Sequence, residues 1–195
     1  EMRPQHRLGH IRIDDEHIPV IGSYDIVVMG GGTSGAPAAI GAARRGAKVL
    51  LAEYLHGLGG IGTIGLIGRY HYGYQEGFTK EVDNGVKEIG GEGVKSMGGE
   101  GHPRKLDQDD GRRKVWVRDW KMEWWRREVR KAGGDIWFGV LGCGAVVEGN
   151  ELKGVVLATP QGKGIVLADK VIDSTGSADI AIAAGAEYEY TGAED

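Results

Sequence analysis

The sequence predicts an α/β fold built on a parallel sheet, and three observations support this prediction. A short apolar run at residues 25–29 (DIVVM) is typical of a buried strand, and a glycine-rich turn follows it at residues 30–35. Four apolar residues then repeat at the spacing of one helix face: Ala36, Ala39, Ile40 and Ala43. A second apolar run at residues 48–52 (KVLLA) completes a strand–helix–strand unit of about 30 residues, the size of a βαβ unit with parallel strands.

The later part of the chain predicts helices and a mixed set of strands. Val82, Val86 and Ile89 share one helix face, and a second amphipathic helix over residues 117–132 carries Trp120, Trp124 and Trp125. Its basic residues are expected to form a solvated face: Lys121, Arg126, Arg127, Arg130 and Lys131. The expected strands are residues 135–140, a three-stranded antiparallel meander over 145–168 and a separate buried strand at 170–173, followed by a short helix at 178–184.

One domain of residues 22–186 is expected, with a polar extension at residues 1–21. Residues 90–111 hold seven glycines and several charges without periodicity, so we expect a long loop insertion there. Residues 187–195 are expected to begin a further domain with a strand, because tyrosines alternate with glutamates. Residue 1 is Glu rather than Met, so we expect a processed N-terminus, and the compartment, cytoplasmic or exported, is left open.

Composition excludes several classes of protein. A net charge of -4 and a pI of about 5.9 argue against a nucleic-acid-binding surface. The single cysteine excludes an intrachain disulfide and a cysteine-based zinc or iron–sulfur site within this chain. No stretch approaches the roughly 20 apolar residues of a membrane-spanning helix. Glycine makes up 36 of the 195 residues, more than twice the usual share of about 7%, which indicates many turns or close approach to a ligand.

The turn at residues 30–35 (GGGTSG) has the G-x-G-x-x-G spacing of a dinucleotide-binding loop. Gly30 permits the tight turn, Gly32 lets the backbone approach a pyrophosphate, and Gly35 lets the helix pack on the strand. The N–H groups and the dipole of the helix start then favour the anion. Glu53 ends the second strand, where its carboxylate can accept both hydroxyls of an adenosine ribose and disfavours the 2′-phosphate of NADP. We therefore predict a dinucleotide site, with NAD and FAD both open at this point.

Two further motifs carry a resemblance to a known family. Residues 58–63 (LGGIGT) follow Glu53 closely, and residues 171–179 (VIDSTGSAD) follow the predicted meander. Together with the glycine loop, they resemble the FAD-dependent oxidoreductases with a glutathione-reductase-like FAD-binding domain, near the fumarate-reductase-type flavoproteins. The resemblance covers most of residues 24–63 and 130–186 and is weak over 70–115. It implies a Rossmann-like FAD-binding domain with an inserted three-stranded meander, incomplete without a C-terminal half.

The resemblance implies FAD as the cofactor and extends the set of candidate binding residues. These are Gly30, Gly32, Thr33, Ser34, Gly35, Glu53, Gly59, Gly60, Gly62, Thr63, Cys143, Thr175, Gly176 and Asp179. No metal site is expected, and no catalytic residue is assigned. His56 and His71 lie near the glycine-rich loops, but histidines without a chemical role are the simpler interpretation.

The expected function is that of the FAD-binding part of an oxidoreductase, which transfers a hydride between a small organic substrate and the flavin. An NAD-dependent dehydrogenase domain and a non-catalytic nucleotide-binding subunit remain as alternatives. Members of the resembled family continue with a substrate domain and a final flavin-contacting segment. We therefore expect a second polypeptide that carries the C-terminal half, and we expect no nucleic-acid partner and no membrane span.

Overall fold

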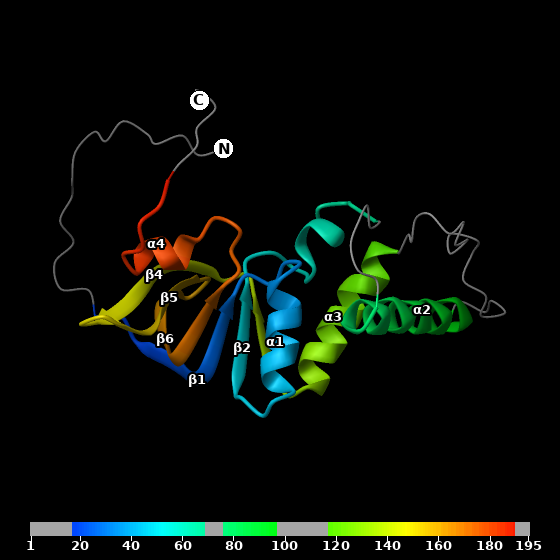
Figure 1. Ribbon diagram of the computed structural model, residues 1–195, viewed down its shortest axis with the longest axis horizontal. Coiled ribbons are helices and arrows are strands. Elements are labelled where there is room, and N and C mark those ends of the chain that lie inside the picture. The colour runs from blue at the N-terminus through cyan, green and yellow to red at the C-terminus, as the bar shows by residue number, and fades with distance from the viewer. Residues whose placement is uncertain (1–16, 69–75, 97–116, 190–195) are drawn as a thin grey trace, which may run out of the picture.

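The computed structural model of the chain describes residues 17–68, 76–96 and 117–189, and these form one mixed sheet with helices packed against it (Figure 1). The sheet has six strands in the order β3-β2-β1-β6-β5-β4. β1 pairs in parallel with β2 and β6, β2 pairs in parallel with β3, and the β4-β5-β6 meander is antiparallel. The strands are β1 (Val20–Met29), β2 (Val49–Glu53), β3 (Asp135–Phe138), β4 (Leu141–Glu148), β5 (Glu151–Thr159) and β6 (Gly162–Asp173). The predicted α/β fold with an antiparallel meander is confirmed.

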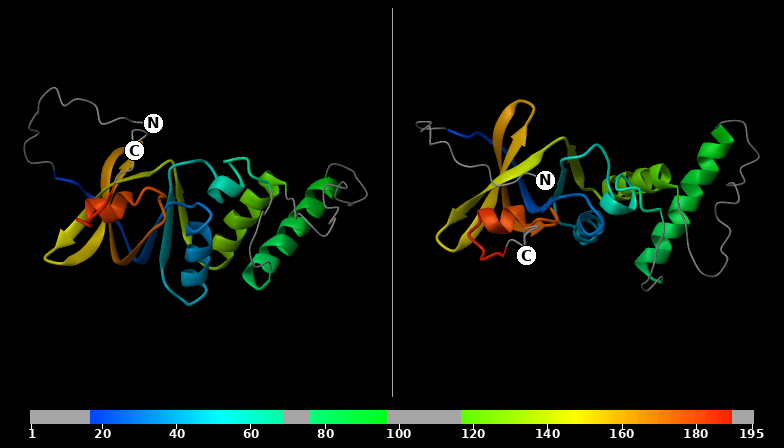
Figure 2. Two further views of the ribbon diagram at one scale, coloured as in Figure 1. Left: turned by 45° about the horizontal axis from the view of Figure 1, so that its top comes forward. Right: turned by 90° about the horizontal axis from the view of Figure 1, so that it is seen from above.

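The central strands are buried on both faces, which explains their continuous apolar runs. Val28 and Leu51 belong to a core that α1 and α3 complete, whereas Val27 and Leu50 belong to a second core on the other face, shared with the meander. The two further views show α1, α3 and α2 on the same side of the strands (Figure 2). The helices are α1 (Gly35–Ala43), α2 (Phe78–Ser96), α3 (Arg118–Lys131), α4 (Asp179–Ala183) and the 3-10 turn η1 (Gly60–Gly62).

Two strands differ from the prediction in extent. β1 begins at Val20, five residues before the apolar run, because its first half pairs with β6. The third meander strand and the strand at 170–173 are one strand, β6, so their separation was wrong. Asp169 and Lys170 are exposed side chains that interrupt the apolar run, but the backbone pairing with β1 continues through them.

The predicted loop at 90–111 was wrong at its start, because α2 continues to Ser96; residues 97–111 lie outside the described part. Gly85 and Gly90 allow α2 to pack closely on α3. A Cβ atom at Gly85 would lie 1.7 Å from Nε1 of Trp124, and one at Gly90 would lie 2.2 Å from Cζ3 of Trp120. These glycines therefore reflect helix–helix contact rather than a turn.

Two further expectations were also wrong. Lys121 lies on the buried side of α3 with 6% of its surface exposed, because α2 covers this face. Residues 186–189 are not in a strand, and residues 190–195 lie outside the described part.

Candidate cofactor site

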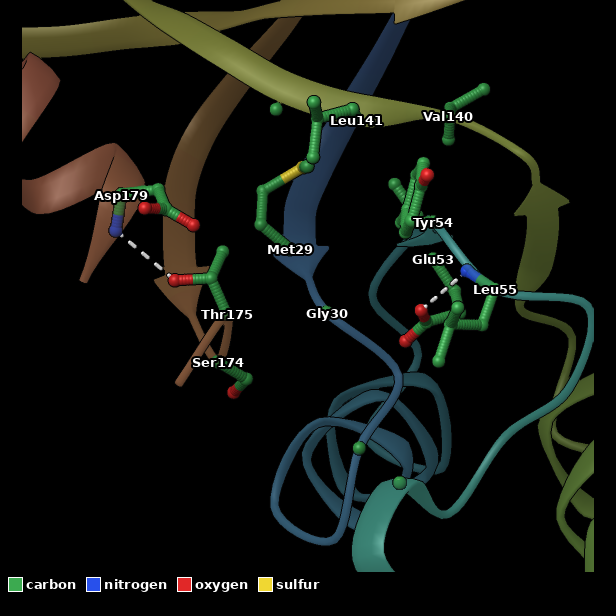
Figure 3. A pocket seen from close by; sticks show the side chains of 14 residues that line it. Met29, Gly30, Glu53, Tyr54, Leu55, Val140, Leu141, Ser174, Thr175 and Asp179 are labelled. Carbon is green, nitrogen blue, oxygen red and sulfur yellow. Dashed lines mark hydrogen bonds between the residues drawn. The ribbon is translucent and has the colours of Figure 1, made fainter. Parts of the chain in front are cut away.

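A pocket lies where the carboxyl ends of β2, β1 and β6 meet. These strands are neighbours in the sheet, and β1 and β6 lead to helices on opposite faces, since α1 belongs to one core and Ile180 of α4 to the other. Open α/β sheets bind ligands at such positions. The pocket has a volume of about 320 Å³ (Figure 3). It is lined by Met29, Gly30, Gly32, Ala52, Glu53, Tyr54, Leu55, Gly60, Val140, Leu141, Gly142, Ser174, Thr175 and Asp179.

The pocket brings together residues from all three predicted motifs. Six of the predicted residues line it: Gly30, Gly32, Glu53, Gly60, Thr175 and Asp179. The others do not line it: Thr33, Ser34, Gly35, Gly59, Gly62, Thr63, Cys143 and Gly176. Most of these lie beside lining residues in the same loops, so the predicted segments converge even where individual side chains do not reach the cavity.

Three of the four glycines in the first loop differ in what a Cβ atom there would meet. Gly30 has a φ of 91°, and a Cβ atom there would lie 2.4 Å from the carbonyl oxygen of Ser174. A Cβ atom at Gly35 would lie 1.8 Å from the carbonyl oxygen of Gly30, so the start of α1 needs glycine to pack on β1. At Gly32 a Cβ atom would meet no protein atom within 4 Å. Protein packing therefore does not require glycine at this position, and the open space leaves room for a ligand to approach the backbone.

Glu53 joins the end of β2 to the glycine loop. Its side chain is 9% exposed, and its Oε2 accepts a 2.6 Å hydrogen bond from the backbone N–H of Gly31. Its Oε1 accepts a 2.7 Å bond from the N–H of Leu55. An ionised carboxylate has about four lone-pair positions, so these two bonds leave room for two hydroxyl donors.

The second loop packs directly on the first. The N–H of Gly59 donates to the carbonyl oxygen of Gly31 (2.8 Å), and the hydroxyl of Thr33 donates to the carbonyl oxygen of Gly59 (3.3 Å). A Cβ atom at Gly60 would lie 3.0 Å from Cα of Gly32. Thr63 is buried, and its hydroxyl donates to the carbonyl oxygen of Leu58 (2.7 Å), so it stabilises the loop.

The third motif is organised by Asp173 at the end of β6. Its Oδ1 accepts hydrogen bonds from the N–H of Thr175 (3.0 Å) and from the hydroxyl of Thr175 (2.7 Å). Its Oδ2 accepts bonds of 2.9 Å from the N–H groups of Ile180 and Ala181. Burial by itself raises the pKa of Asp173, but the backbone bonds from Ala181, Thr175 and Ile180 and the Thr175 hydroxyl outweigh it and lower the pKa. The carboxyl group is therefore ionised at neutral pH.

Sequence reasoning missed the apolar part of the lining. Tyr54 and Leu55 follow Glu53 and are 62% and 39% exposed, and residues 140–142 form the link from β3 to β4. Cys143 was predicted, but its thiol donates to the carbonyl oxygen of Val156 (3.5 Å), and it is the preceding residues that line the pocket. Their position directly after predicted strand ends was the available signal.

The two histidines do not add to the pocket in the described residues. His56 is exposed and is not among the lining residues. His71 lies outside the described residues. Within residues 17–68, 76–96 and 117–189 there is no group of three or more metal-ligating side chains. No helix of this described part is both long and apolar enough to span a membrane.

The family model described as "FAD dependent oxidoreductase" matches residues 25–195. The chain belongs to this family. FAD is therefore the cofactor of the fold described above, and the open space at Gly32 and the remaining acceptor capacity of Glu53 fit its diphosphate and its adenosine ribose. The narrower resemblance of this flavoprotein to fumarate-reductase-type proteins stays a prediction.

Several solved structures show the same fold. A geranylgeranyl bacteriochlorophyll reductase-like protein from Thermoplasma acidophilum matches with a TM-score of 0.58 and 21% identity, over 85% of this chain and 43% of that one. THI4 from Thermovibrio ammonificans matches with a TM-score of 0.53 and 19% identity, over 83% and 61%. L-proline dehydrogenase from P. horikoshii matches with a TM-score of 0.55 and 16% identity, over 88% and 58%. No curated protein matches the sequence.

The flavoprotein chain thus spans between 43% and 61% of the length of these three structures. At these identities the likeness establishes the fold and leaves the substrate open.

Proposed function

We propose that this flavoprotein chain is the cofactor-binding part of an oxidoreductase in which FAD exchanges a hydride with a small organic substrate. The observation that carries the proposal is the order of the candidate binding residues at the carboxyl ends of three neighbouring strands. Glu53 ends β2, the glycine loop follows β1, and Thr175 and Asp179 follow β6. This order matches a ligand with a diphosphate at its centre.

The protein and the cofactor have separate tasks in this proposal. When bound, FAD supplies the redox chemistry. The chain's own residues bind and orient it: the backbone at Gly32 leaves room for the diphosphate, and Glu53 accepts sugar hydroxyls. The family match does not favour an NAD-dependent dehydrogenase or a non-catalytic nucleotide-binding subunit.

Anaerobic mixing of the native protein with pools of small organic compounds tests hydride transfer. We expect at least one compound to bleach the visible flavin absorption. Deuterium at the donated position of that compound is expected to slow the bleaching, because the transferred bond is broken in the reductive step. A flavin that light can reduce but no small compound can reduce would contradict the proposed activity.

We also propose that a second polypeptide completes the fold. The support is that this chain covers only 43%, 61% and 58% of the three matched structures described above. Denaturing gel electrophoresis of the native flavin-containing protein is expected to show this chain of 20.9 kDa together with a second band. A single band, at this mass or at a larger one, would contradict the proposal.

A further inference from the structure

The hydrogen bonds around Asp173 determine what the β6 side of the pocket can offer to a ligand. Both oxygens of the Asp173 carboxylate accept two hydrogen bonds each, from Thr175, Ile180 and Ala181. These four bonds fill the lone-pair positions of an ionised carboxylate. Asp173 is also absent from the pocket lining, so it acts on a ligand through its neighbours.

The first consequence concerns the direction of the Thr175 hydroxyl. An ionised carboxylate can only accept, so the single hydroxyl proton of Thr175 points to Asp173 at 2.7 Å. One lone pair of the same hydroxyl accepts from the N–H of Asp179 (3.1 Å). The remaining lone pair is the only hydrogen-bonding capacity that this hydroxyl can turn to the cavity.

The second consequence concerns the start of α4. The N–H groups of Ile180 and Ala181 donate to Asp173, so they are not available to an anion. The turn before α4 is held in a strained conformation, because Ala178 has a φ of 57°, in the left-handed region that residues with a side chain rarely adopt. The carboxylate bridges this turn and fixes Asp179 beside Thr175, as the close view shows (Figure 3).

The Thr175 and Asp179 side chains, which Asp173 arranges, are therefore both acceptors, and the neighbouring Ser174 adds a hydroxyl that can donate or accept. Thr175 offers a lone pair, and Asp179 offers an exposed carboxylate. Phosphate oxygens, which are acceptors and negatively charged, do not fit such a wall, whereas hydroxyl groups do. The wall also lies on the opposite side of β1 from Glu53, because β2 and β6 flank β1 in the sheet.

We infer that Asp173 is a positioning residue that makes the Thr175 and Asp179 side chains an acceptor wall for the hydroxyl-bearing chain on the flavin side of the diphosphate. Glu53 then holds the sugar on the adenine side, and the glycine loop holds the diphosphate between them. This assignment rests on the proposed function and deepens it, since it states which part of FAD each strand end contacts.

A comparison of two ligands tests the assignment. FAD carries both sugar-like chains, whereas ADP carries only the adenosine ribose and the phosphates. With the complete native protein freed of flavin, titration calorimetry gives the dissociation constants of both ligands. Thr175→Val is nearly isosteric and removes the acceptor. We expect it to weaken FAD about 3- to 10-fold, the effect of one lost hydrogen bond, and to change ADP by less than about twofold.

Further variants separate positioning from folding. Thr175→Ser keeps the hydroxyl and is expected to bind FAD like the wild type. Asp173→Asn replaces one acceptor by a donor, and it is expected to raise the ratio of the FAD to the ADP dissociation constant as Thr175→Val does. Glu53→Gln is expected to weaken both ligands. If Thr175→Val does not fold, Asp179→Asn replaces it in the test, because Asp179 is exposed. This variant is also expected to raise the ratio of the FAD to the ADP dissociation constant.

The outcomes test the proposed function and the acceptor wall separately. Failure of the wild-type protein to bind FAD would overturn the proposed function. Wild-type FAD binding combined with an equal loss of FAD and ADP affinity in Thr175→Val, or with no loss of either, would overturn the acceptor wall alone.

Discussion

The backbone N–H of Gly31 donates a 2.6 Å hydrogen bond to Oε2 of Glu53, which links the glycine loop to the end of the neighbouring strand. One residue further, Gly32 faces open space. The same carboxylate thus fixes the loop that we propose to bind the diphosphate, and it retains acceptor capacity for the proposed sugar contact. This link explains why an acidic residue at the end of β2 and a glycine loop after β1 work as one unit.

Glu53→Gln should weaken FAD binding about 10- to 100-fold. The amide group of Gln places a donor against one of two backbone donors, Gly31 or Leu55, and a buried unpaired donor costs about 1–3 kcal/mol. Flavin fluorescence titration measures the change. Glu151→Gln is the matched control, because Glu151 is an exposed residue of the meander, and its FAD affinity should equal that of the wild type. Equal affinities of both variants would contradict this account of Glu53.

Gly32→Ala and Gly35→Ala should separate binding from folding. A Cβ atom at Gly32 meets no protein atom, so the variant should keep the wild-type melting temperature without flavin and lose FAD affinity at least about 10-fold. A Cβ atom at Gly35 overlaps the carbonyl oxygen of Gly30, so this variant should be destabilised before any ligand is added. Thermal unfolding with and without FAD checks both. A destabilised Gly32→Ala protein, or one with unchanged affinity, would show that the loop is structural.

Gly85→Ala should destabilise the protein by about 2 kcal/mol or more, although Gly→Ala within a helix ordinarily stabilises by about 0.5–1 kcal/mol. The reason is the overlap with Trp124 across the α2–α3 contact. Gly41→Ala in α1 is the control, since a Cβ atom there meets only the end of Arg45 at 3.8 Å and should give the ordinary stabilisation. Chemical denaturation measures both values. The same sign for both variants would refute the packing explanation.

The stability of the protein should rise between about pH 8 and 10.5 through Lys121. Burial lowers the pKa of Lys121 to about 8, although the attraction of Asp83 opposes this shift. In this pH window the unfolded chain holds more protons than the folded one, so the free energy of unfolding increases with pH, by up to about 3 kcal/mol. Denaturation at several pH values compares the wild type with Lys121→Met, which should lose this rise. Parallel pH curves for the two proteins would contradict the prediction.

The sequence predicted the parts of the site that depend on local chemistry. The glycine loop, Glu53 and the motif at residues 171–179 combine a strand end with a few residues that a ligand requires, and such patterns are readable along the chain. Tyr54 and residues 140–142 were missed because they contribute surface rather than a recognisable functional group. Asp173 belongs to the motif at residues 171–179, but its four hydrogen bonds depend on the fold of the following turn and could not be predicted from the sequence.

Three of the wrong predictions share one physical cause, which is contact between segments distant in sequence. The glycines of α2 look like turn residues until the tryptophans of α3 are placed against them. Lys121 looks exposed until α2 covers its face. The polar pair at residues 169–170 looks like a strand end until pairing with β1 carries the backbone through it.

The visible absorption spectrum of the native protein, followed by denaturation and identification of the released cofactor, tests the central claim most directly. This account predicts flavin absorption bands and release of one FAD for each copy of this chain. A colourless native protein that also fails to take up added FAD would contradict it.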